Sequence, residues 1–561
     1  MPTNKMSSAL AAACALMLSA CGGGGSSSDT PAPPVTPAAL TIGGTAATGA
    51  AMAGASVQIK CAGGSGSATS ATDGSFSTSI TDAALPCALS ATSSDGKTTL
   101  RSVAPAGTAT SATANITPLS EIIVAQVAGG DAGALFSSFD AAAQAKLSST
   151  NVASAVTTVA AALKGTIDLS GVNPLSDALV ATGGGKTGNA LDQKLDALGA
   201  ALKAGGSSVA DVAAALLANP GAPAVVQTLL QPAATSCAAL RSGKFHLLDA
   251  YDGERPVSLA TVDASALTVK EADGTILTFA PVSGSACAYT AGDGKVSAYV
   301  AKSGVIVVRY LDDAATARAA LLVPDQSVPL SEMAGTWNIA IYGIDEFGGP
   351  AAPYFSVQTL DKTSLSTAGA DCVGLNACES WIPRATDIFT VDTTEGGFTH
   401  ADDEGSGRLF PVKTATGQIA LFGMLFDTQK RPIGLVFFSK QTALSLPTVG
   451  AVDNFWDMQV NSAGIAQAVA DTQTTIQSVD TSAGSYTRIR TSDGRVDGFT
   501  LNKPRDGMRY RAAGSSVGTN GKTITFGATL NTPLPGMGLT VYSSLTTDAA
   551  TNFFGISIGK P

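Results

Sequence analysis

Lys295–Leu311, with the sequence KVSAYVAKSGVIVVRYL, shows the pattern that dominates the chain after Cys237. Two strand-like runs lie on either side of a short turn, and Asp293-Gly294 precedes them. Asp-Gly and Asn-Gly between such runs are typical of tight β-hairpins. The region is therefore predicted to be antiparallel β structure. Further signals of this kind are Asp273-Gly274, Asp493-Gly494 and Asn520-Gly521.

A faint repeat divides this region. SGKF at Phe245, AGTW at Trp337 and DNFW at Trp456 each open a block of roughly 90 to 120 residues that continues through strands and tight turns. We predict three barrel-like or sandwich-like antiparallel β modules, at residues 237–327, 328–448 and 449–561. The alternative is that three aromatic residues precede strands by coincidence.

Residues 115–232 have a helical period instead. In NITPLSEIIVAQVAG, Thr117 is a suitable N-cap, Pro118 suits the first helical position and Glu121 lies near the positive end of the helix dipole. We therefore predict a small α-helical bundle between the N-terminal and C-terminal regions. Four leucines farther along recur at helical spacing, namely Leu191, Leu195, Leu198 and Leu202.

The region before the bundle, residues 40–114, contains short strands separated by glycine turns, with Asp73-Gly74 as a hairpin signal. Its segments GAAMAGASVQI and TDGSF resemble the two signature strands of the carboxypeptidase regulatory-like domain, a small prealbumin-like β-sandwich. That resemblance implies a spacer or binding accessory without catalytic residues. Together with NITPLSE, NPLSDALVATG and LDQKLDALGAAL, the region also resembles a group of uncharacterised bacterial lipoproteins. The fold class predicted for the whole chain is multidomain α+β.

The first residues have the pattern of an export signal. Lys5 precedes an apolar run, roughly Ala9 to Leu18, that is too short to span a bilayer. Leu18-Ser19-Ala20-Cys21 resembles the lipobox of bacterial lipoproteins, which implies a signal peptide at residues 1–20 and lipid attachment at Cys21. Gly22 implies the outer membrane by that family's sorting pattern, and residues 21–39 are a Gly/Ser- and Pro-rich tether. The alternative is an ordinary signal peptide with an unrelated cysteine.

Composition narrows the choice of partners. The chain is 45% hydrophobic and 14% charged, with a formal net charge of −10. Such a chain can form large cores, and its acidic balance gives no general attraction for nucleic acid.

The remaining cysteines suit an oxidising compartment. Without Cys14 and Cys21, six remain, and an even number favours disulfides. We expect the local pairings, although fifteen pairings of six cysteines are possible. The alternative, a zinc site, lacks the CxxC pairs and histidines that such sites use. The expected pairs are Cys61 with Cys87, Cys237 with Cys287, and Cys372 with Cys378.

Motifs for catalysis are sparse. His246 and His400 are the two histidines of the chain, so a nucleophile with a histidine base must use one of them. Residues 514–518 match G-x-S-x-G but lie between strand-like runs, which predicts a hairpin loop instead of a nucleophile elbow. Residues 183–187, GGGKT, imitate the end of a P-loop without its leading glycine or preceding strand. We predict no catalytic residues and no cofactor.

Two charged segments are candidates for binding. DTTEGGFTHADDEGSGR, residues 392–408, offers Asp402, Asp403 and Glu404 as oxygen ligands for Ca²⁺, although a solvated hairpin explains it more simply. In residues 486–511, strand alternation places Arg488 with Arg490, and Arg509 with Arg511, on common faces that could bind an anionic glycan. The alternative is a polar outer sheet face neutralised by nearby aspartates, namely Asp493, Asp497 and Asp506.

Three tryptophans complete the set of candidates, because aromatic rings can stack on sugars. Core positions explain Trp337, Trp381 and Trp456 more simply. We therefore expect a lipid-anchored envelope protein with a non-catalytic binding or structural role, whose partner is the membrane together with a polysaccharide or an envelope protein. The alternatives are a surface-anchored hydrolase of polysaccharide or ester that uses carboxylates of the C-terminal β region, and an envelope assembly factor.

Overall fold

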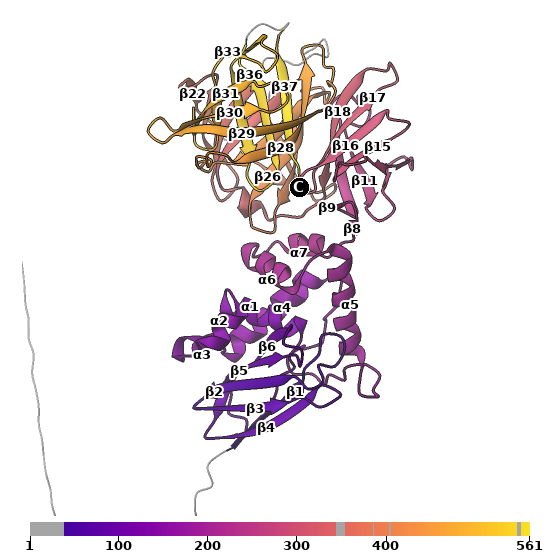
Figure 1. Ribbon diagram of the computed structural model, residues 1–561, viewed down its shortest axis with the longest axis vertical. Coiled ribbons are helices and arrows are strands. Elements are labelled where there is room, and N and C mark those ends of the chain that lie inside the picture. Colours follow the sequence, from indigo (N-terminus) through magenta and orange to yellow (C-terminus); the bar gives the residue numbers. More distant parts are fainter. Residues whose placement is uncertain (1–38, 344–353, 385, 403–404, 547–550) are drawn as a thin grey trace, which may run out of the picture.

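The computed structural model describes residues 39–343, 354–384, 386–402, 405–546 and 551–561. In Figure 1 the described chain begins with two small sheets, continues through helices and ends in an assembly of three larger sheets. The predicted signal peptide, Cys21 and the tether lie outside the described residues.

The N-terminal region consists of two sheets that enclose one core. Leu40, Ile42, Val57 and Leu89 are among the residues buried between them. The Cys61–Cys87 disulfide joins two neighbouring strands of the larger sheet. The first sheet has the order β4-β1-β7 and the second β3-β2-β5-β6. Their strands are β1 Ala39–Thr45, β2 Ser56–Ala62, β3 Gly64–Thr69, β4 Ser75–Thr81, β5 Ala84–Thr92, β6 Thr99–Ala104 and β7 Ser111–Thr113.

Seven helices follow, and their ends agree with local capping chemistry. Thr117 and Ser120 form a capping box at the start of α1, and Gly129 ends that helix in the left-handed conformation. The core under the helices also contains Ala88 and Val103 of the preceding sheet, so the helices share a core with β structure and do not form a separate bundle. The helices are α1 Pro118–Ala128, α2 Ala132–Ser137, α3 Ala141–Lys146, α4 Ser149–Leu163, α5 Ala190–Gly205, α6 Val209–Ala218 and α7 Pro223–Leu229.

Within the described residues, no single helix combines the length and apolar character that crossing a bilayer requires. Helices α5 and α6 meet that requirement only as a pair, and they are bent by 86° relative to each other.

The first C-terminal sheet is a nine-stranded meander whose first strand pairs with its last. A two-stranded ribbon of β8 Ala233–Ala234 and β9 Cys237–Arg241 precedes it. The strands run β10 Gly243–Leu248, β11 Val257–Asp263, β12 Thr268–Lys270, β13 Ile276–Thr278, β14 Ala280–Pro281, β15 Ala288–Ala291, β16 Val296–Val300, β17 Ile306–Leu311 and β18 Ala317–Pro324. The order in the sheet is β13-β12-β11-β10-β18-β17-β16-β15-β14.

The second C-terminal sheet repeats this topology strand for strand. Its order is β22-β21-β20-β19-β27-β26-β25-β24-β23, so both sheets are barrels left open between their fourth and fifth strands. A 3₁₀ turn, Leu330–Met333, separates the two sheets in the chain. The strands are β19 Gly335–Gly343, β20 Tyr354–Leu360, β21 Ser366–Cys372, β22 Cys378–Trp381, β23 Thr390–Val391, β24 Phe398–Ala401, β25 Ser406–Lys413, β26 Ile419–Phe426 and β27 Pro432–Lys440.

The third C-terminal sheet is closed. It forms the barrel β28-β29-β30-β31-β32-β35-β36-β37, in which β28 also pairs with β37. The strands are β28 Val452–Asn461, β29 Ala470–Asp480, β30 Ser485–Arg490, β31 Val496–Leu501, β32 Arg509–Arg511, β35 Thr529–Leu534, β36 Leu539–Ser544 and β37 Phe553–Gly559. A separate hairpin is formed by β33 Gly514–Val517 and β34 Thr523–Phe526. The barrel-like alternative of the sequence prediction therefore describes this part of the chain.

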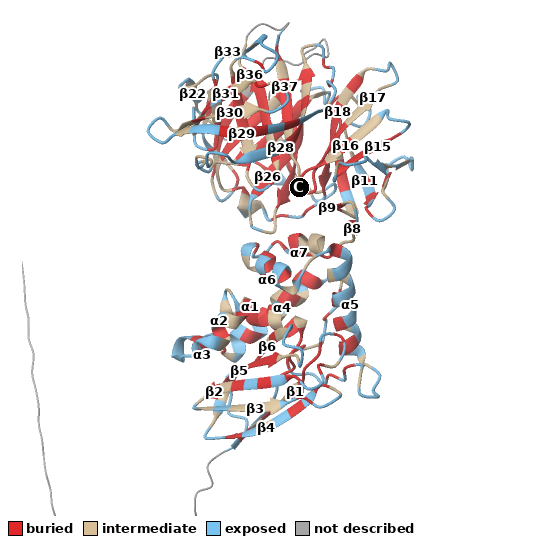
Figure 2. Cartoon of the chain, in the orientation of Figure 1, coloured by how far each residue is buried: buried red, intermediate tan, exposed pale blue. Residues whose placement is uncertain are grey.

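The aromatic residues of the faint repeat occupy the first strand of each sheet. Phe245 in β10, Trp337 in β19 and Trp456 in β28 are all buried. One continuous core joins the three sheets, and it includes the ring contact between Phe437 and Phe554 across two of them. Figure 2 shows buried residues along these strands and exposed residues in the outer loops.

Candidate functional site

The arginines singled out in the sequence lie on the inner face of the closed barrel. Trp456 and Met458 of β28 pack outward against the shared core, so the alternate residues Phe455 and Asp457 point inward. Arg488 of β30 reaches the ring of Phe455 on β28, with β29 between the two strands. The alternative of an outer sheet face is wrong, because closing the barrel turns this face toward its interior.

Three of the barrel arginines are neutralised by neighbouring aspartates. Arg490 pairs with Asp493, and its Nε lies 2.8 Å from Asp493 Oδ1. Arg495 binds both oxygens of Asp497 at 2.9 and 3.0 Å. Arg511 donates to Asp497 Oδ1 at 3.4 Å and to the Gly527 carbonyl at 2.8 Å, and burial lowers its pKa to about 10. These pairs match part of the neutralised-face alternative.

Arg488 and Arg509 lack such partners. Arg488 Nε lies 3.9 Å from Asp497 Oδ2, beyond hydrogen-bonding distance, and Arg509 donates through Nη1 to the Tyr486 hydroxyl at 3.1 Å. The Nε atoms of both arginines are buried without a hydrogen-bond partner among the described residues. Burial, with the positive charge of Arg509 as the next cause, lowers the pKa of Arg488 below its ordinary value. Arg488 and Arg509 therefore repel each other, and both line the same space.

That space is a pocket of about 250 Å³ in the closed barrel. Its wall combines the two guanidinium groups with polar groups and apolar side chains, and one carboxylate, that of the exposed Asp453, lies among the lining residues. Pockets with a few convergent polar groups in an apolar wall are typical binding sites for small ligands. The other lining residues are Asn454, Phe455, Leu534, Gly538, Leu539, Thr540, Ser557 and Gly559.

Beside the pocket a buried polar network fixes Ser557. Asp457 accepts hydrogen bonds from the Tyr542 hydroxyl at 2.9 Å and from the Ser557 hydroxyl at 2.8 Å. Gln459 donates to the same Tyr542 hydroxyl at 2.9 Å. Burial raises the pKa of Asp457 and the pKa of Tyr542, so the neutral form of each group is favoured.

Guanidinium groups suit this pocket for one class of ligand. Arginine presents a planar set of N–H donors that binds carboxylate, sulfate or phosphate oxygens in pairs, and such charge-assisted hydrogen bonds are strong where water is excluded. Alternation along β30 and β32 could identify the arginines from the sequence. The contribution of Phe455, Thr540 and Ser557 required knowledge of strand pairing over about 100 residues.

A larger cleft has a structural explanation instead. It measures about 860 Å³ and lies between α7 and the first two C-terminal sheets. Two of its cations have partners: Arg241 donates to the carbonyls of Gly205, Leu229 and Gln231, and Lys413 pairs with Glu332 at 3.0 Å. The Arg241 contacts join α5 and α7 to β9.

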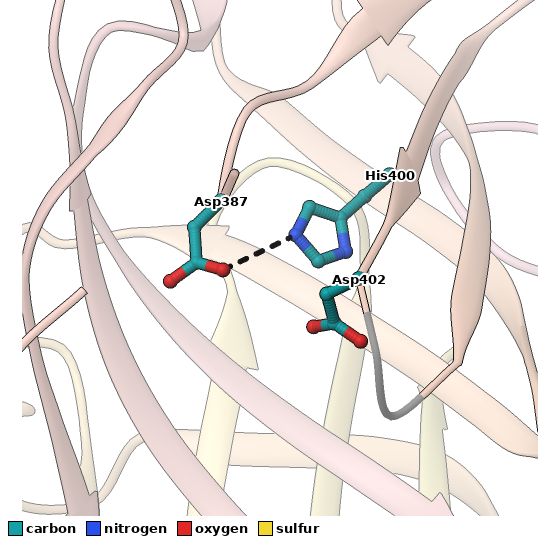
Figure 3. Close-up of side chains that lie close together, drawn as sticks. All are labelled: Asp387, His400 and Asp402. Carbon is teal, nitrogen blue, oxygen red and sulfur yellow. Dashed lines mark ion pairs between the residues drawn. The ribbon is translucent and has the colours of Figure 1, made fainter. Parts of the chain in front are cut away.

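The histidines lie in different places. His246 is buried, stacks on Phe410 and lies 3.1 Å from Asp325 Oδ1. His400 lies on β24 beside Asp387 and Asp402 (Figure 3). Of the calcium candidates, Asp402 belongs to this group, whereas Asp403 and Glu404 lie outside the described residues.

The remaining motifs have structural roles. Gly514–Val517 forms one strand of the β33–β34 hairpin. Lys186 of the GGGKT segment forms an ion pair with Asp73 at 2.6 Å. Trp381 is half-buried and donates to Asp371 at 3.0 Å, while Trp337 and Trp456 are core residues.

The disulfides have the expected local pairing. Cys61–Cys87, Cys237–Cys287 and Cys372–Cys378 are all present. Each bond lies within one β region of the chain.

Comparisons with known proteins give no family. No family model matches the chain, and no curated protein matches it. Among solved structures, transferrin binding protein B of serogroup B Neisseria meningitidis has 10% identity and a TM-score of 0.20, and that of Haemophilus parasuis has 13% identity and a TM-score of 0.18. Each match covers 54% of this chain and 65% of the other, slightly less than two thirds of those structures. A protein of unknown function of the DUF3598 family from Nostoc punctiforme has 9% identity and a TM-score of 0.16, over 41% of this chain and 97% of that one.

Proposed function

We propose that this protein is a lipid-anchored outer-membrane protein that binds an anionic ligand in its C-terminal barrel. The observation that carries the proposal is that Arg488 and Arg509 face one pocket without a carboxylate in hydrogen-bonding distance. Burying two cations without an anion is unfavourable, and a bound anion would offset that energy. The resemblance of Leu18-Ser19-Ala20-Cys21 to a lipobox, followed by a tether, supports the envelope location in this proposal.

The size of the pocket limits the ligand. About 250 Å³ is smaller than the usual range for drug-sized ligands, so the pocket suits one charged unit, such as a uronate, a sulfated sugar or a phosphorylated sugar at the end of a glycan. The apolar wall of Phe455, Leu534 and Leu539 would contact the sugar ring. The hydrolase alternative needs two converging carboxylates, and the residues that line this pocket include one, Asp453.

The test uses the purified full-length chain in thermal unfolding and in calorimetric titration. The probes are galacturonate and its oligomers, glucose 6-sulfate and lipopolysaccharide, with neutral dextran as the uncharged comparison. Free ligand at a hundred times its dissociation constant contributes about 2.7 kcal/mol of stability, which produces a measurable shift in Tm. We expect a shift with at least one anionic probe and none with dextran.

Charge-matched variants separate the pocket from the rest of the surface. Arg488→Gln and Arg509→Gln should each abolish the shift, because each removes a guanidinium that faces the ligand. Arg431→Gln removes the same charge from an arginine whose side chain is 70% exposed and pairs with Asp427, and it should leave the shift intact. Equal binding by all three variants would overturn the proposal, and so would a response to dextran as large as that to the anions.

A further inference from the structure

A second site lies on the second C-terminal sheet, apart from the arginine pocket. His400 of β24, Asp402 directly after that strand, and Asp387 of the segment between β22 and β23 bring three ligand atoms within 4.8 Å of one another. Figure 3 shows the Asp387 carboxylate to one side of the imidazole and the Asp402 carboxylate below it. None of these three residues lines the arginine pocket, which belongs to the third C-terminal sheet, so they form a separate group.

The imidazole presents an unused nitrogen to this group. His400 Nε2 is buried and has no hydrogen-bond partner among the described residues, and it lies 3.9 Å from Asp387 Oδ1. That distance is too long for a hydrogen bond. The ring is held against Phe389, with 5.0 Å between the ring centroids, so Nε2 has a fixed direction.

Backbone amides hold both carboxylates in place. The Arg384 N–H donates to Asp387 Oδ2 at 2.7 Å, which leaves Oδ1 directed toward His400. The Gly405 N–H donates to Asp402 Oδ1 at 2.9 Å. Ligands whose orientation is set by such outer hydrogen bonds are typical of built metal sites.

We propose that Asp387, His400 and Asp402 bind one divalent transition-metal ion, with Zn²⁺ as the reference ion. Metal–ligand bonds of about 2.0 to 2.2 Å on both sides can span the 3.9 Å between His400 Nε2 and Asp387 Oδ1. A nitrogen ligand with two carboxylates suits Zn²⁺ and its neighbours in the transition series, whereas Ca²⁺ takes oxygen ligands. The calcium hypothesis for Asp402 is thereby replaced by a site with a different ion.

The position of this site gives the ion a structural role. Strands β22 and β23 are the two free edges of the second sheet, and Asp387 belongs to the connection between them. A metal bound to Asp387 and His400 would fix this connection to β24 beside the opening of the barrel. The side chains of His400 and Asp387 are 19% and 12% exposed, so the ion would lie close to the protein surface.

The test is metal titration of the untagged full-length chain after removal of metal with a chelator. We expect calorimetric titration with ZnCl₂ to saturate at one ion per chain and to raise Tm, and Co²⁺ to give a visible absorption spectrum of nitrogen and oxygen ligation. CaCl₂ at the same concentration should neither saturate the site nor compete with Zn²⁺. Failure of Zn²⁺ to saturate at this ratio, or equal affinity for Ca²⁺, would overturn the proposal.

Variants locate the ion on these residues. His400→Gln and Asp402→Asn should each lower the Zn²⁺ affinity by at least about 100-fold, since loss of an outer partner alone lowers affinity 10- to 100-fold. His246→Gln alters the other histidine and should leave the titration unchanged. Asp402 is half-buried, so the Asp402→Asn chain remains informative if His400→Gln does not fold. Wild-type affinity in either ligand variant contradicts the site.

The anion-binding proposal and the metal-binding proposal can be tested independently. Arg488→Gln should retain Zn²⁺ binding, and His400→Gln should retain the response to anionic probes. A wild-type chain that lacks one of the two responses therefore refutes that proposal without affecting the other.

Discussion

Arg488 and Arg509 lie against the same aromatic ring. The guanidinium carbon of Arg488 is 4.8 Å from the centroid of Phe499, and that of Arg509 is 5.0 Å from it. The two arginines come from β30 and β32, and Phe499 belongs to β31 between them. The ring face offsets part of the repulsion between the cations, and it directs both toward the pocket.

Replacing Arg488 by leucine should separate stability from binding. The side chain is 14% exposed and has no hydrogen-bonded acid, so Arg488→Leu is expected to raise the free energy of unfolding by about 1 to 3 kcal/mol. Anion binding should be lost in the same variant. Chemical denaturation and calorimetric titration measure the two effects.

Arg511→Leu is the control for that prediction. The Arg511 side chain is 8% exposed, but it pairs with Asp497 and donates to the Gly527 carbonyl. Its loss should lower the free energy of unfolding by about 2 kcal/mol, because buried acceptors are left with fewer donors. If both variants change stability in the same direction, the distinction between paired and unpaired arginines is wrong.

Asp457 should make the stability of the barrel depend on pH. Burial raises its pKa above the ordinary value of 3.8, so the native state binds more protons than the unfolded chain at pH values between the two. The stability that this group contributes is complete below about pH 4 and is lost as pH rises through the raised pKa. Asp457→Asn mimics the neutral form, so the wild type should lose stability relative to the variant as pH rises above about 4.

The control for this prediction is Asp493→Asn, for which the sign is opposite. The hydrogen bond from Arg490 lowers the pKa of Asp493, so its contribution is present above the unfolded pKa and is lost as pH falls through the folded value. Urea unfolding from pH 2.5 to pH 8 measures both differences. If the free energy of unfolding of the wild type instead increases relative to that of Asp457→Asn as pH rises, Asp457 is ionised in the native state.

The disulfides should differ in their effect on stability according to loop length. Cys237–Cys287 closes a separation of 50 residues and both cysteines are buried, whereas Cys372–Cys378 closes a separation of 6. Loop-closure entropy predicts a loss of about 4 kcal/mol for the double Cys→Ala variant of the first and about 2 kcal/mol for that of the second. Differential scanning calorimetry compares the transitions of the two variants, and equal losses would contradict the loop-closure explanation.

Local features of the fold were predictable from sequence, because they depend on a few neighbouring residues. Asp293 and Gly294 join β15 to β16 with positive φ angles of 55° and 87°, which is why this dipeptide indicates a tight hairpin. The Thr117 cap likewise starts α1 where the sequence places it. Alternation also placed Arg488 and Arg490 on one face correctly.

The closure of the third barrel cannot be predicted from residues that are neighbours in the sequence. Whether Trp456 of β28 pairs with Ile558 of β37 depends on contacts about 100 residues apart, and this pairing turns the arginine face inward. The metal group arises over a shorter distance, because the chain turns back between Asp387, which precedes β23, and His400 on β24. The sequence instead suggests Asp403 and Glu404 as calcium ligands, because they directly follow Asp402.

Phe499 supplies the sharpest test of how the pocket is built. Phe499→Leu keeps an apolar side chain but removes the ring that both pocket cations contact, so each guanidinium becomes free to turn away from the ligand. A cation–π contact contributes about 1 to 2 kcal/mol in a desolvated site, which predicts an anion affinity about 5- to 30-fold lower. Phe526 offers a matched control, because its ring contacts Arg495 and Arg511 at 5.1 and 5.0 Å, and Asp497 already holds both. Calorimetric titration should therefore show reduced anion affinity in Phe499→Leu and wild-type affinity in Phe526→Leu. An equal reduction in both variants would contradict this prediction. It would mean that the rings act through the general stability of the barrel and not through Arg488 and Arg509.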